Sequence, residues 1–266
     1  MHGRVNTVEW PTPHLARIVL DGDGLEGFTP TGDTDSYVNV AIPPAGAPYS
    51  TPFALEDLKA LPNEVRPYRR RYTVRRWDAE RRELTIEVVV HGDGPGGGWA
   101  RDAQPGDALV FTGPAGGYRP DPEADWHLLV GDESALPAIG ASLEAVPAGA
   151  PVVVRLVCDG PEHELALETP GELDLVWLHR TGGAGDEDLL PEAVRALDAP
   201  PGVVHGFIHG EAGETREVRR HLLAERGIDP ARLSCSPYWR RGLDDEAWRK
   251  VKAAWNADVA RDVPVG

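Results

Sequence analysis

Cysteine is almost absent from this chain, which carries only Cys158 and Cys235 among its 266 residues. Two thiols so far apart in the sequence exclude a disulfide framework and a cysteine-based metal cluster, so we interpret each as a small buried side chain. Long apolar runs are also missing, and the segment Met1 to Trp10 lacks the basic start and apolar stretch of a signal peptide. We therefore expect a cytoplasmic protein with no membrane partner.

Positive charge is scarce, and lysine is the scarcer of the two basic residues. The chain has 27 Lys and Arg against 43 Asp and Glu, a formal net charge of -16. This charge argues against nucleic acid as a partner, and the acidic surface leads us to expect a monomer. Lysine occurs only at Lys59, Lys250 and Lys252, so any anion site must be built from arginine, which can form two parallel hydrogen bonds to an oxyanion.

Motifs for covalent catalysis and for nucleotide hydrolysis are missing. The sequence has no G-x-S-x-G, no P-loop and no Cys/His cluster. His205 and His209 are four residues apart, but they lie in a strand-like run without helical metal-binding geometry, so we expect no metal there. An enzyme with no nucleophile of its own depends on a bound cofactor for its chemistry.

The predicted elements indicate two domains, residues 1–120 and 121–266. Turn-bounded β-branched runs predict a small antiparallel β-barrel with a short helix at 99–103 and strands at 15–20, 37–42, 68–76, 83–91 and 107–112. A polar, proline-marked linker follows at 120–125. Beyond it the pattern predicts an α/β parallel sheet that ends in a C-terminal helix: strands at 126–130, 152–157, 173–178 and 203–208, and helices at 133–146, 187–197, 214–226 and 244–260.

The basic strand from Arg69 to Arg75 is the stretch around which the chain is organised. Side chains two apart share a face of a strand, so Arg70 and Tyr72 point one way while Arg71 and Thr73 point the other. A guanidinium and a phenol on one face suit a phosphate and an aromatic ring, and we interpret this strand as one that holds a flavin. An exposed basic edge strand, charged to prevent aggregation, is the alternative.

A glycine-rich turn follows the next predicted strand and contains a formal G-x-G-x-x-G at Gly92, Gly94 and Gly97. It fails as a dinucleotide fingerprint because the helix after it is cut short at Pro105 and another strand follows. What remains is a short helix whose N-terminal amides can meet a phosphate. A glycine-rich hairpin loop without a ligand is the alternative.

Two stretches of the second domain are further candidates. Gly131 to Ile139 leaves the first strand of the α/β domain, where open sheets bind ligands, although Asp132 and Ser134 could equally be helix caps. Tyr238-Trp239-Arg240-Arg241-Gly242 combines aromatic rings with guanidinium groups. These side chains can stack on a ring and hold an anion, or simply pack under the final helix.

Three motifs in the expected order resemble those of the siderophore-interacting proteins, which are FAD-containing ferric-siderophore reductases of the ferredoxin-reductase superfamily. Arg70 to Thr73 resembles the R-x-Y-T flavin strand, and His91 to Ala100 resembles the phosphate turn H-G-x-x-G-P-A-S-x-W-A. Gly131 to Ile139 is similar to G-D-E-T-A-L-P-A-I, and the resemblance covers most of residues 15–245. It implies an FAD-binding barrel, residues 1–120, followed by a nicotinamide-binding-type domain, residues 121–266.

The resemblance also implies roles for individual residues. Arg70 would bind the FAD pyrophosphate, Tyr72 would pack against the isoalloxazine, and Thr73 would hydrogen-bond the polar edge of the ring. The second domain would place its acidic motif by the flavin or the incoming nicotinamide. The further cofactor-binding residues that it implies are His91, Gly97, Gly98, Trp99, Ala100, Asp132, Glu133, Ser134, Ala135, Tyr238 and Trp239.

The implied activity is FAD-dependent reduction of an Fe(III)-siderophore to release Fe(II), with electrons from NADH, NADPH or ferredoxin. A general NAD(P)H:flavin or electron-transfer reductase, or a non-catalytic siderophore-binding module, is the alternative. Two departures from the family pattern matter: Gly96-Gly97 replaces Ala-Ser in the phosphate turn, and Asn39 replaces a lysine of the chelate site. The second favours a less anionic siderophore, with Arg119, Arg240 and Arg241 as candidate contacts.

Overall fold

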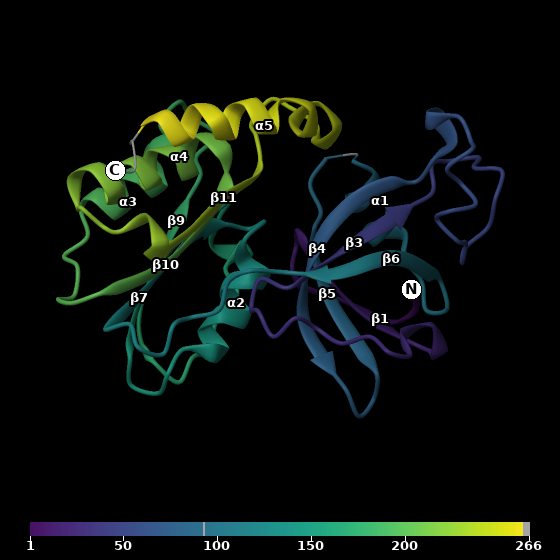
Figure 1. Ribbon diagram of the computed structural model, residues 1–266, viewed down its shortest axis with the longest axis horizontal. Helices are drawn as coiled ribbons and strands as arrows, with labels where there is room; N and C mark the ends of the chain where they lie inside the picture. The colour runs from purple at the N-terminus through teal and green to yellow at the C-terminus, as the bar shows by residue number, and fades with distance from the viewer. Residues whose placement is uncertain (93, 263–266) are drawn as a thin grey trace. The chain divides into compact units, whose positions relative to one another are not determined.

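The chain folds as an antiparallel barrel followed by a parallel-sheet domain, as predicted (Figure 1). The computed structural model describes residues 1–92 and 94–262. Internal contacts divide the chain into two compact units, Met1–Arg119 and Pro120–Gly266. Within the described residues, no helix is both long and apolar enough to span a membrane.

The first unit is a closed barrel of six strands in the order β1-β2-β5-β4-β3-β6. Strand β1 was not predicted, because its sequence buries little beyond Gly3, Val5 and Thr12 and so lacks an apolar alternation. It still closes the barrel by pairing with both β2 and β6. The strands are β1 (His2–Thr12), β2 (Leu15–Asp21), β3 (Tyr37–Ile42), β4 (Tyr68–Asp78), β5 (Glu83–Val89) and β6 (Ala108–Ala115).

The register of β3 against β4 decides which side chains of the basic strand face which way. Val38 lies opposite Tyr72 and Val40 lies opposite Arg70, and both valines belong to the barrel core. Asn39 lies opposite Arg71 on the other face of the sheet. The predicted alternation along the strand is therefore confirmed, with Arg70 and Tyr72 on the side of the core residues and Arg71 on the outer side.

A single α-helix accompanies the barrel among the described residues of this unit, α1 (Pro95–Asp102). It begins earlier than the predicted start at residue 99 because Pro95 occupies the first turn, where a missing amide hydrogen costs nothing. Ala100 is fully buried in the barrel core, and the half-buried Trp99 packs against that core. The helix is thereby held on the barrel by its apolar face.

The second unit is a five-stranded parallel sheet in the order β11-β10-β7-β8-β9. Helix α4 continues as a π-helical turn at His221–Glu225. The elements are β7 (Trp126–Asp132), α2 (Leu136–Ala145), β8 (Pro151–Cys158), β9 (Glu172–His179), α3 (Leu189–Arg195), β10 (Val204–Glu211), α4 (Ala212–Arg220), β11 (Leu233–Trp239) and α5 (Asp245–Asp262).

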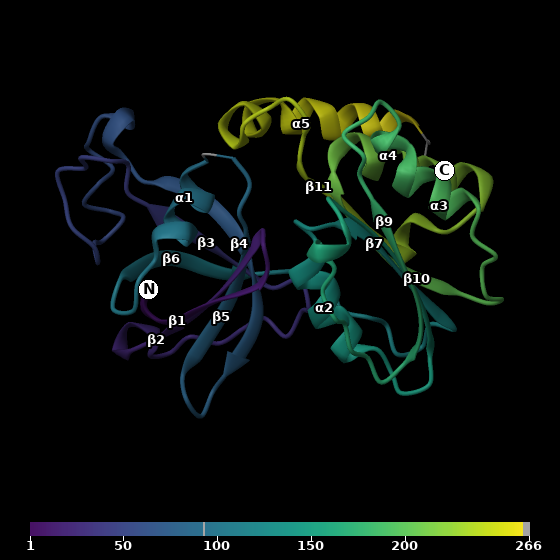
Figure 2. The ribbon, with the colours of Figure 1, turned by 180° about the vertical axis from the view of Figure 1, so that it is seen from behind.

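Helices cover both faces of this sheet (Figures 1 and 2). Leu128 and Val130 of β7 pack in one cluster with residues of α3 and α4. Gly131, on the opposite face, lies against α2, because a Cβ built there would stand 2.7 Å from Ala135 Cβ and 3.2 Å from Ile139 Cδ1. The chain runs from β7 outward to β9 and then returns to β10 on the other side of β7. The carboxyl ends of β7 and β10 therefore form the switch point of the sheet, where open α/β folds bind ligands.

Both cysteines are free. Cys158 is buried and Cys235 is half-buried. Burial raises the pKa of the Cys158 thiol to about 11 and that of Cys235 to about 12. Each is therefore an uncharged thiol at neutral pH and not a reactive nucleophile.

His127 is expected to make the α/β unit sensitive to acid. The residue is fully buried at the start of β7, neither ring nitrogen has a hydrogen-bond partner, and His205 lies opposite on β10. Burial, followed by repulsion from His205, lowers the pKa of His127, although Asp121 partly opposes the shift. In the unfolded chain His127 is protonated near its ordinary pKa of about 6.5, whereas in the folded chain it stays neutral to a lower pH. The free energy of unfolding therefore falls as the pH drops below about 6.5.

Replacing His127 by leucine is expected to raise the free energy of unfolding by about 1–2 kcal/mol at pH 7, because it removes an unsatisfied buried polar group. The gain should be larger at pH 5. Urea unfolding at both pH values measures it, with the exposed His14→Leu as the matched control. An equal acid sensitivity in His127→Leu and the parent protein would contradict the assignment.

Candidate functional site

The first candidate site lies in the barrel unit, where strand β4 meets the start of helix α1. A Cβ at Gly96 would collide with the hydroxyl of Tyr72 and would stand 3.5 Å from Cγ of Arg70. Only glycine permits this close approach of the helix backbone to both side chains. The structure thus brings the basic strand and the glycine-rich turn, which are separate in the sequence, into one place.

The N-terminal turn of α1 supplies the backbone donors of this site. Gly94 is the N-cap, Pro95 follows it, and the amide of Gly98 donates to the Gly94 carbonyl at 2.9 Å. The amides of Gly96 and Gly97 belong to the first turn, whose N–H groups have no helical acceptor. The amides of this turn and the guanidinium of Arg70 fit a pyrophosphate, and the phenol of Tyr72 on the same strand as Arg70 fits an aromatic ring attached to it.

The remaining barrel residues that were predicted as cofactor contacts lie around this centre. Thr73 is buried, on the opposite side of β4 from Tyr72, and His91 is exposed in the turn before α1. Asp93 of the same turn lies outside the described residues. Arg119, predicted as a chelate contact, is exposed and its guanidinium donates to the carbonyl of Gly32 at 2.8 Å.

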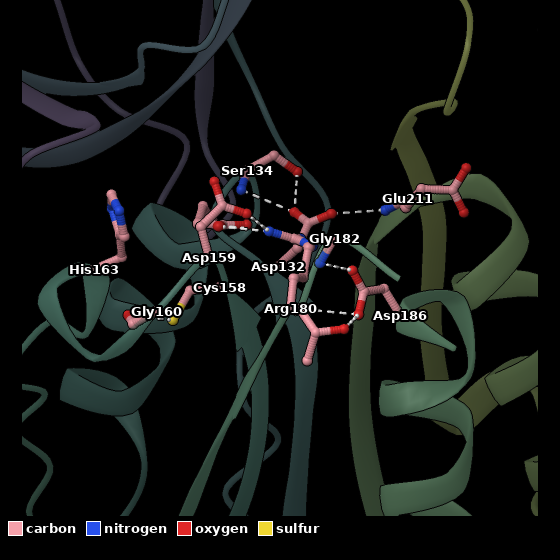
Figure 3. A network of polar contacts seen from close by, with 12 residues as sticks. Asp132, Ser134, Cys158, Asp159, Gly160, His163, Arg180, Gly182, Asp186 and Glu211 are labelled. Atoms are coloured by element: carbon pink, nitrogen blue, oxygen red, sulfur yellow. Dashed lines mark hydrogen bonds and ion pairs between the residues drawn. The ribbon is translucent and has the colours of Figure 1, made fainter. Parts of the chain in front are cut away.

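The second candidate site lies in the α/β unit at the switch point of the sheet, and Asp132 is its centre (Figure 3). This carboxyl group is fully buried at the end of β7. It accepts hydrogen bonds from the amide and hydroxyl of Ser134, from the Glu211 amide at 2.9 Å and from Trp239 Nε1 at 2.7 Å. One side chain therefore ties together the carboxyl ends of β7, β10 and β11.

Asp132 and Ser134 do not cap helix α2, which was the alternative reading of their sequence. Ala135 stands at the N-cap position and no side chain caps that helix. Ala135 itself is fully buried. The Asp132 carboxylate instead accepts from the amide of Ser134, two residues later, and so fixes the loop between β7 and α2. Aspartate side chains commonly stabilise turns in this way.

Two glutamates of β10 and α4 extend the network. Glu211 caps α4 by accepting from the amides of Gly213 and Glu214, and it also accepts from the Arg241 amide at 3.0 Å. Glu214 Oε1 accepts from the Arg241 guanidinium at 3.1 Å, whereas its buried Oε2 has no hydrogen-bond partner. Burial, together with repulsion from Asp132 and Glu211, raises the pKa of Glu214 to about 8. Glu214 is therefore mainly protonated at neutral pH.

The other half of the carboxyl edge is organised by Arg180, which follows β9 (Figure 3). Its guanidinium donates to Glu133 at 2.7 Å and to Asp159 at 2.9 Å. The next loop folds around the buried Asp186, which accepts from the Thr181 amide and hydroxyl and from the Gly182 amide. These hydrogen bonds lower the pKa of Asp186, the Thr181 amide contributing most.

The C-terminal candidates are divided between this network and the surface. Trp239 lies at the end of β11 and binds Asp132, and Tyr238 contacts the ring of His209 at a centroid distance of 5.0 Å. Arg240 and Arg241 are both exposed, and the Arg241 guanidinium is paired with Glu214. Trp239 therefore packs within its own unit, because its indole N–H donates to Asp132. Stacking of this stretch on a ligand ring stays a prediction.

Sequence reasoning assigned no site role to three members of the network, namely Arg180, Glu211 and Glu214. Each lies at or just after the carboxyl end of a strand in the α/β unit. Because ligand sites of parallel sheets occur at that edge, a survey of polar residues following each predicted strand would have found Arg180 and Glu211. Glu214 is recognisable only from its burial and from its contact with Arg241, which follows β11.

Two family descriptions match the chain in sequence order. Residues 4–118 match the siderophore-interacting FAD-binding domain, and residues 124–242 match the siderophore-interacting protein domain. The chain belongs to the siderophore-interacting protein family. Its barrel unit is thereby an FAD-binding domain, which agrees with the pyrophosphate fit of Arg70 and the α1 turn.

Individual relatives cover nearly the whole of this siderophore-interacting protein. The ferric vibriobactin reductase ViuB of Vibrio cholerae is 36% identical over 250 residues, 92% of this chain and 90% of the relative. The NADPH-dependent ferric-chelate reductase of Escherichia coli is 32% identical over 236 residues, covering 87% and 89% of the two chains. The crystal structure of SipS from Aeromonas hydrophila superposes with a TM-score of 0.82 at 28% identity, covering 97% and 98%.

Proposed function

We propose that this chain is an FAD-dependent ferric-siderophore reductase. The observation that carries the proposal is the identity of 36% with a ferric vibriobactin reductase across 92% of the chain, which includes both the barrel and the α/β unit. Reduction of Fe(III) to Fe(II) releases the metal because an oxygen-donor chelate holds Fe(II) far less tightly. The reaction requires no nucleophile, in agreement with the absence of one from the sequence.

The chain's own residues hold and orient the cofactor in this proposal. A bound FAD would supply the redox chemistry, because a flavin can accept two electrons from a nicotinamide, or single electrons from ferredoxin, and pass them on one at a time. Arg70 and the first-turn amides of α1 would bind its pyrophosphate, and Tyr72 would pack against the isoalloxazine. Thr73, His91 and residues 97–100 remain predicted contacts.

We further propose NADPH as the electron donor, with NADH and ferredoxin as the alternatives. The Escherichia coli relative is named for its dependence on NADPH. The carboxyl edge of the sheet, organised by Asp132 and Arg180, is where the α/β unit would receive a nucleotide. Backbone amides at this edge, those of Ser134, Gly182 and Glu211, already donate to the chain's own carboxyl groups, so the nucleotide would be held mainly through other contacts.

The visible absorption spectrum of the purified protein, before and after FAD is added and the excess removed, tests the cofactor. The flavin-loaded protein is then given a ferric chelate with NADPH, NADH or reduced ferredoxin, and Fe(II) is trapped with a chromogenic chelator. Ferricyanide serves as a non-specific acceptor. Fe(II) release with a clear chelate preference supports the proposal, equal use of every acceptor identifies a general reductase, and a colourless protein without turnover identifies a binding module.

Arg70→Gln is expected to weaken FAD binding about tenfold or more, because it removes the guanidinium beside the first turn of α1. FAD fluorescence quenching in a titration measures the dissociation constant. Arg76→Gln is the matched control, since Arg76 is an exposed residue of the same strand and its loss changes the net charge equally. Equal affinity of the two variants for FAD would contradict the role of Arg70.

A further inference from the structure

Strand β9 is the last strand at one side of the parallel sheet, and its outer edge is open. It pairs with β8 alone, in an unbroken register from Glu172 to His179. The amides of Glu172 and Arg180 donate toward β8, to the carbonyls of Ala150 and Cys158. Alternate residues of a strand direct their backbone groups to opposite sides, so the odd-numbered residues of β9 direct theirs away from β8. Among the described residues, these outward amides and carbonyls have no hydrogen-bond partner.

The composition of β9 does little to protect this edge. Edge strands are commonly protected against pairing by lysine, by proline, by a bulge or by short length. Strand β9 is eight residues long, contains neither lysine nor proline, and has no register shift. Leu173 and Val176 are 38% and 37% exposed, and Leu175, Trp177 and Leu178 are half-buried. Accessible apolar side chains therefore border a free backbone edge, which is a template for pairing with another strand.

The distribution of charge along β9 indicates which strand fits this edge. Its acidic residues, Glu172 and Asp174, lie in the first half, whereas the stretch from Val176 onward has no acid and ends in His179 and Arg180. An antiparallel copy of the same strand sets the acidic half of each against the acid-free half of the other. A twofold dimer requires this arrangement, because identical strands related by the axis run in opposite directions. A parallel copy would place like charges opposite each other.

We infer that β9 is a dimerisation edge, on which a second copy of this chain docks antiparallel with Val176 on the twofold axis. Residues with outward backbone groups must face each other across the axis. This register pairs Leu175 with Trp177 of the other copy and Leu173 with His179, so every outward backbone group gains a partner. Val176 faces the same residue of the other copy in a non-hydrogen-bonded pair. The two parallel sheets join into one continuous sheet.

The dimer is expected to be weak and to strengthen with salt. An interface built on one strand pair is small, so we expect a dissociation constant on the order of 10 μM. Each chain carries a formal net charge of -16, so two copies repel each other at long range. Salt at 1 M shortens the screening length to about 3 Å and removes most of this repulsion. The expectation of a monomer, drawn from the acidic surface, then holds for dilute protein at low salt.

Sedimentation velocity of the full chain from about 1 to about 200 μM, at low salt and at 1 M NaCl, tests the inference. Val176→Lys should weaken association about a hundredfold, because two ammonium groups would meet on the axis. Val203→Lys, at an exposed apolar position before β10, changes the charge equally and should leave association within about twofold. Leu175→Pro removes one outward amide and no hydrogen bond to β8, and it should also prevent dimerisation.

A cysteine variant tests the register. The two Cα atoms of a non-hydrogen-bonded antiparallel pair are about 4.5 Å apart, within the range of a disulfide. Under a mild oxidant Val176→Cys should therefore form a disulfide-linked dimer on a non-reducing gel. Val203→Cys and the parent protein, in which Cys158 is buried and Cys235 half-buried, should not. A parent protein with the mass of one chain at every concentration and salt would overturn the inference, as would dimers that persist unchanged in Val176→Lys and Leu175→Pro.

Discussion

Asp132→Ala is expected to lower the free energy of unfolding of the α/β unit by about 3–5 kcal/mol. The substitution removes the acceptor for the Glu211 amide and for Trp239 Nε1, as well as for both donors of Ser134. The Glu211 amide is buried, so water cannot replace the lost partner without opening the sheet edge. Urea unfolding followed by far-ultraviolet circular dichroism measures the loss.

Single-donor variants provide the controls for this prediction. Ser134→Ala removes one hydroxyl donor from Asp132 and is expected to cost only about 1 kcal/mol, and Trp239→Phe removes the indole donor. The Asp132 effect should exceed either of these, because it leaves several donors without a partner at once. Asp132→Ala with a loss below about 1 kcal/mol would show that the three strand ends are held together by other contacts.

Glu214→Gln is expected to remove a pH dependence of several kcal/mol from the stability of the same unit. Burial and the nearby Asp132 and Glu211 raise the pKa of Glu214 to about 8, above an unfolded value near 4.5. The folded chain therefore holds a proton that the unfolded chain releases. This contribution to stability is complete below about pH 4.5 and is lost progressively as the pH rises to about 8.

The glutamine variant keeps the shape of the side chain and carries no charge to desolvate. At pH 8 it is expected to be more stable than the parent protein by a few kcal/mol, since one pKa unit corresponds to about 1.4 kcal/mol. At pH 4.5 the two should be nearly equal. Urea unfolding across this range measures the difference, with the more exposed Glu217→Gln on the same helix as the control. A constant difference between Glu214→Gln and the parent protein at every pH would contradict a raised pKa.

The elements that were predicted from sequence are those whose signal is local. Strand β3 has the predicted bounds, and the apolar runs of β7 and β8 are typical of parallel strands buried on both faces. Strand β1 was missed because it is defined by its partners β2 and β6 more than by its own composition. Alternation along the basic strand was predictable because it depends only on the pleat.

The candidate sites divide in the same way. The glycine-rich turn and the R-x-Y-T strand each carry a recognisable pattern, but their contact at Gly96 and Tyr72 depends on how the helix packs on the barrel. The hydrogen bond between Asp132 and Trp239 joins residues 107 positions apart in the chain. No local pattern specifies such a pair, since it exists only when β7 and β11 end at the same edge of the sheet.

The sequence by itself determined the order of the two units, the faces of the basic strand and the family to which the chain belongs. These properties follow from periodicity and from motifs that are contiguous in the chain. Only the tertiary structure decided that Glu214 holds a proton at neutral pH, and that Arg69 stands beside Asn39 on the outer face of the barrel. Burial and cross-strand register determine both, because each depends on neighbours that the fold brings together from distant parts of the chain.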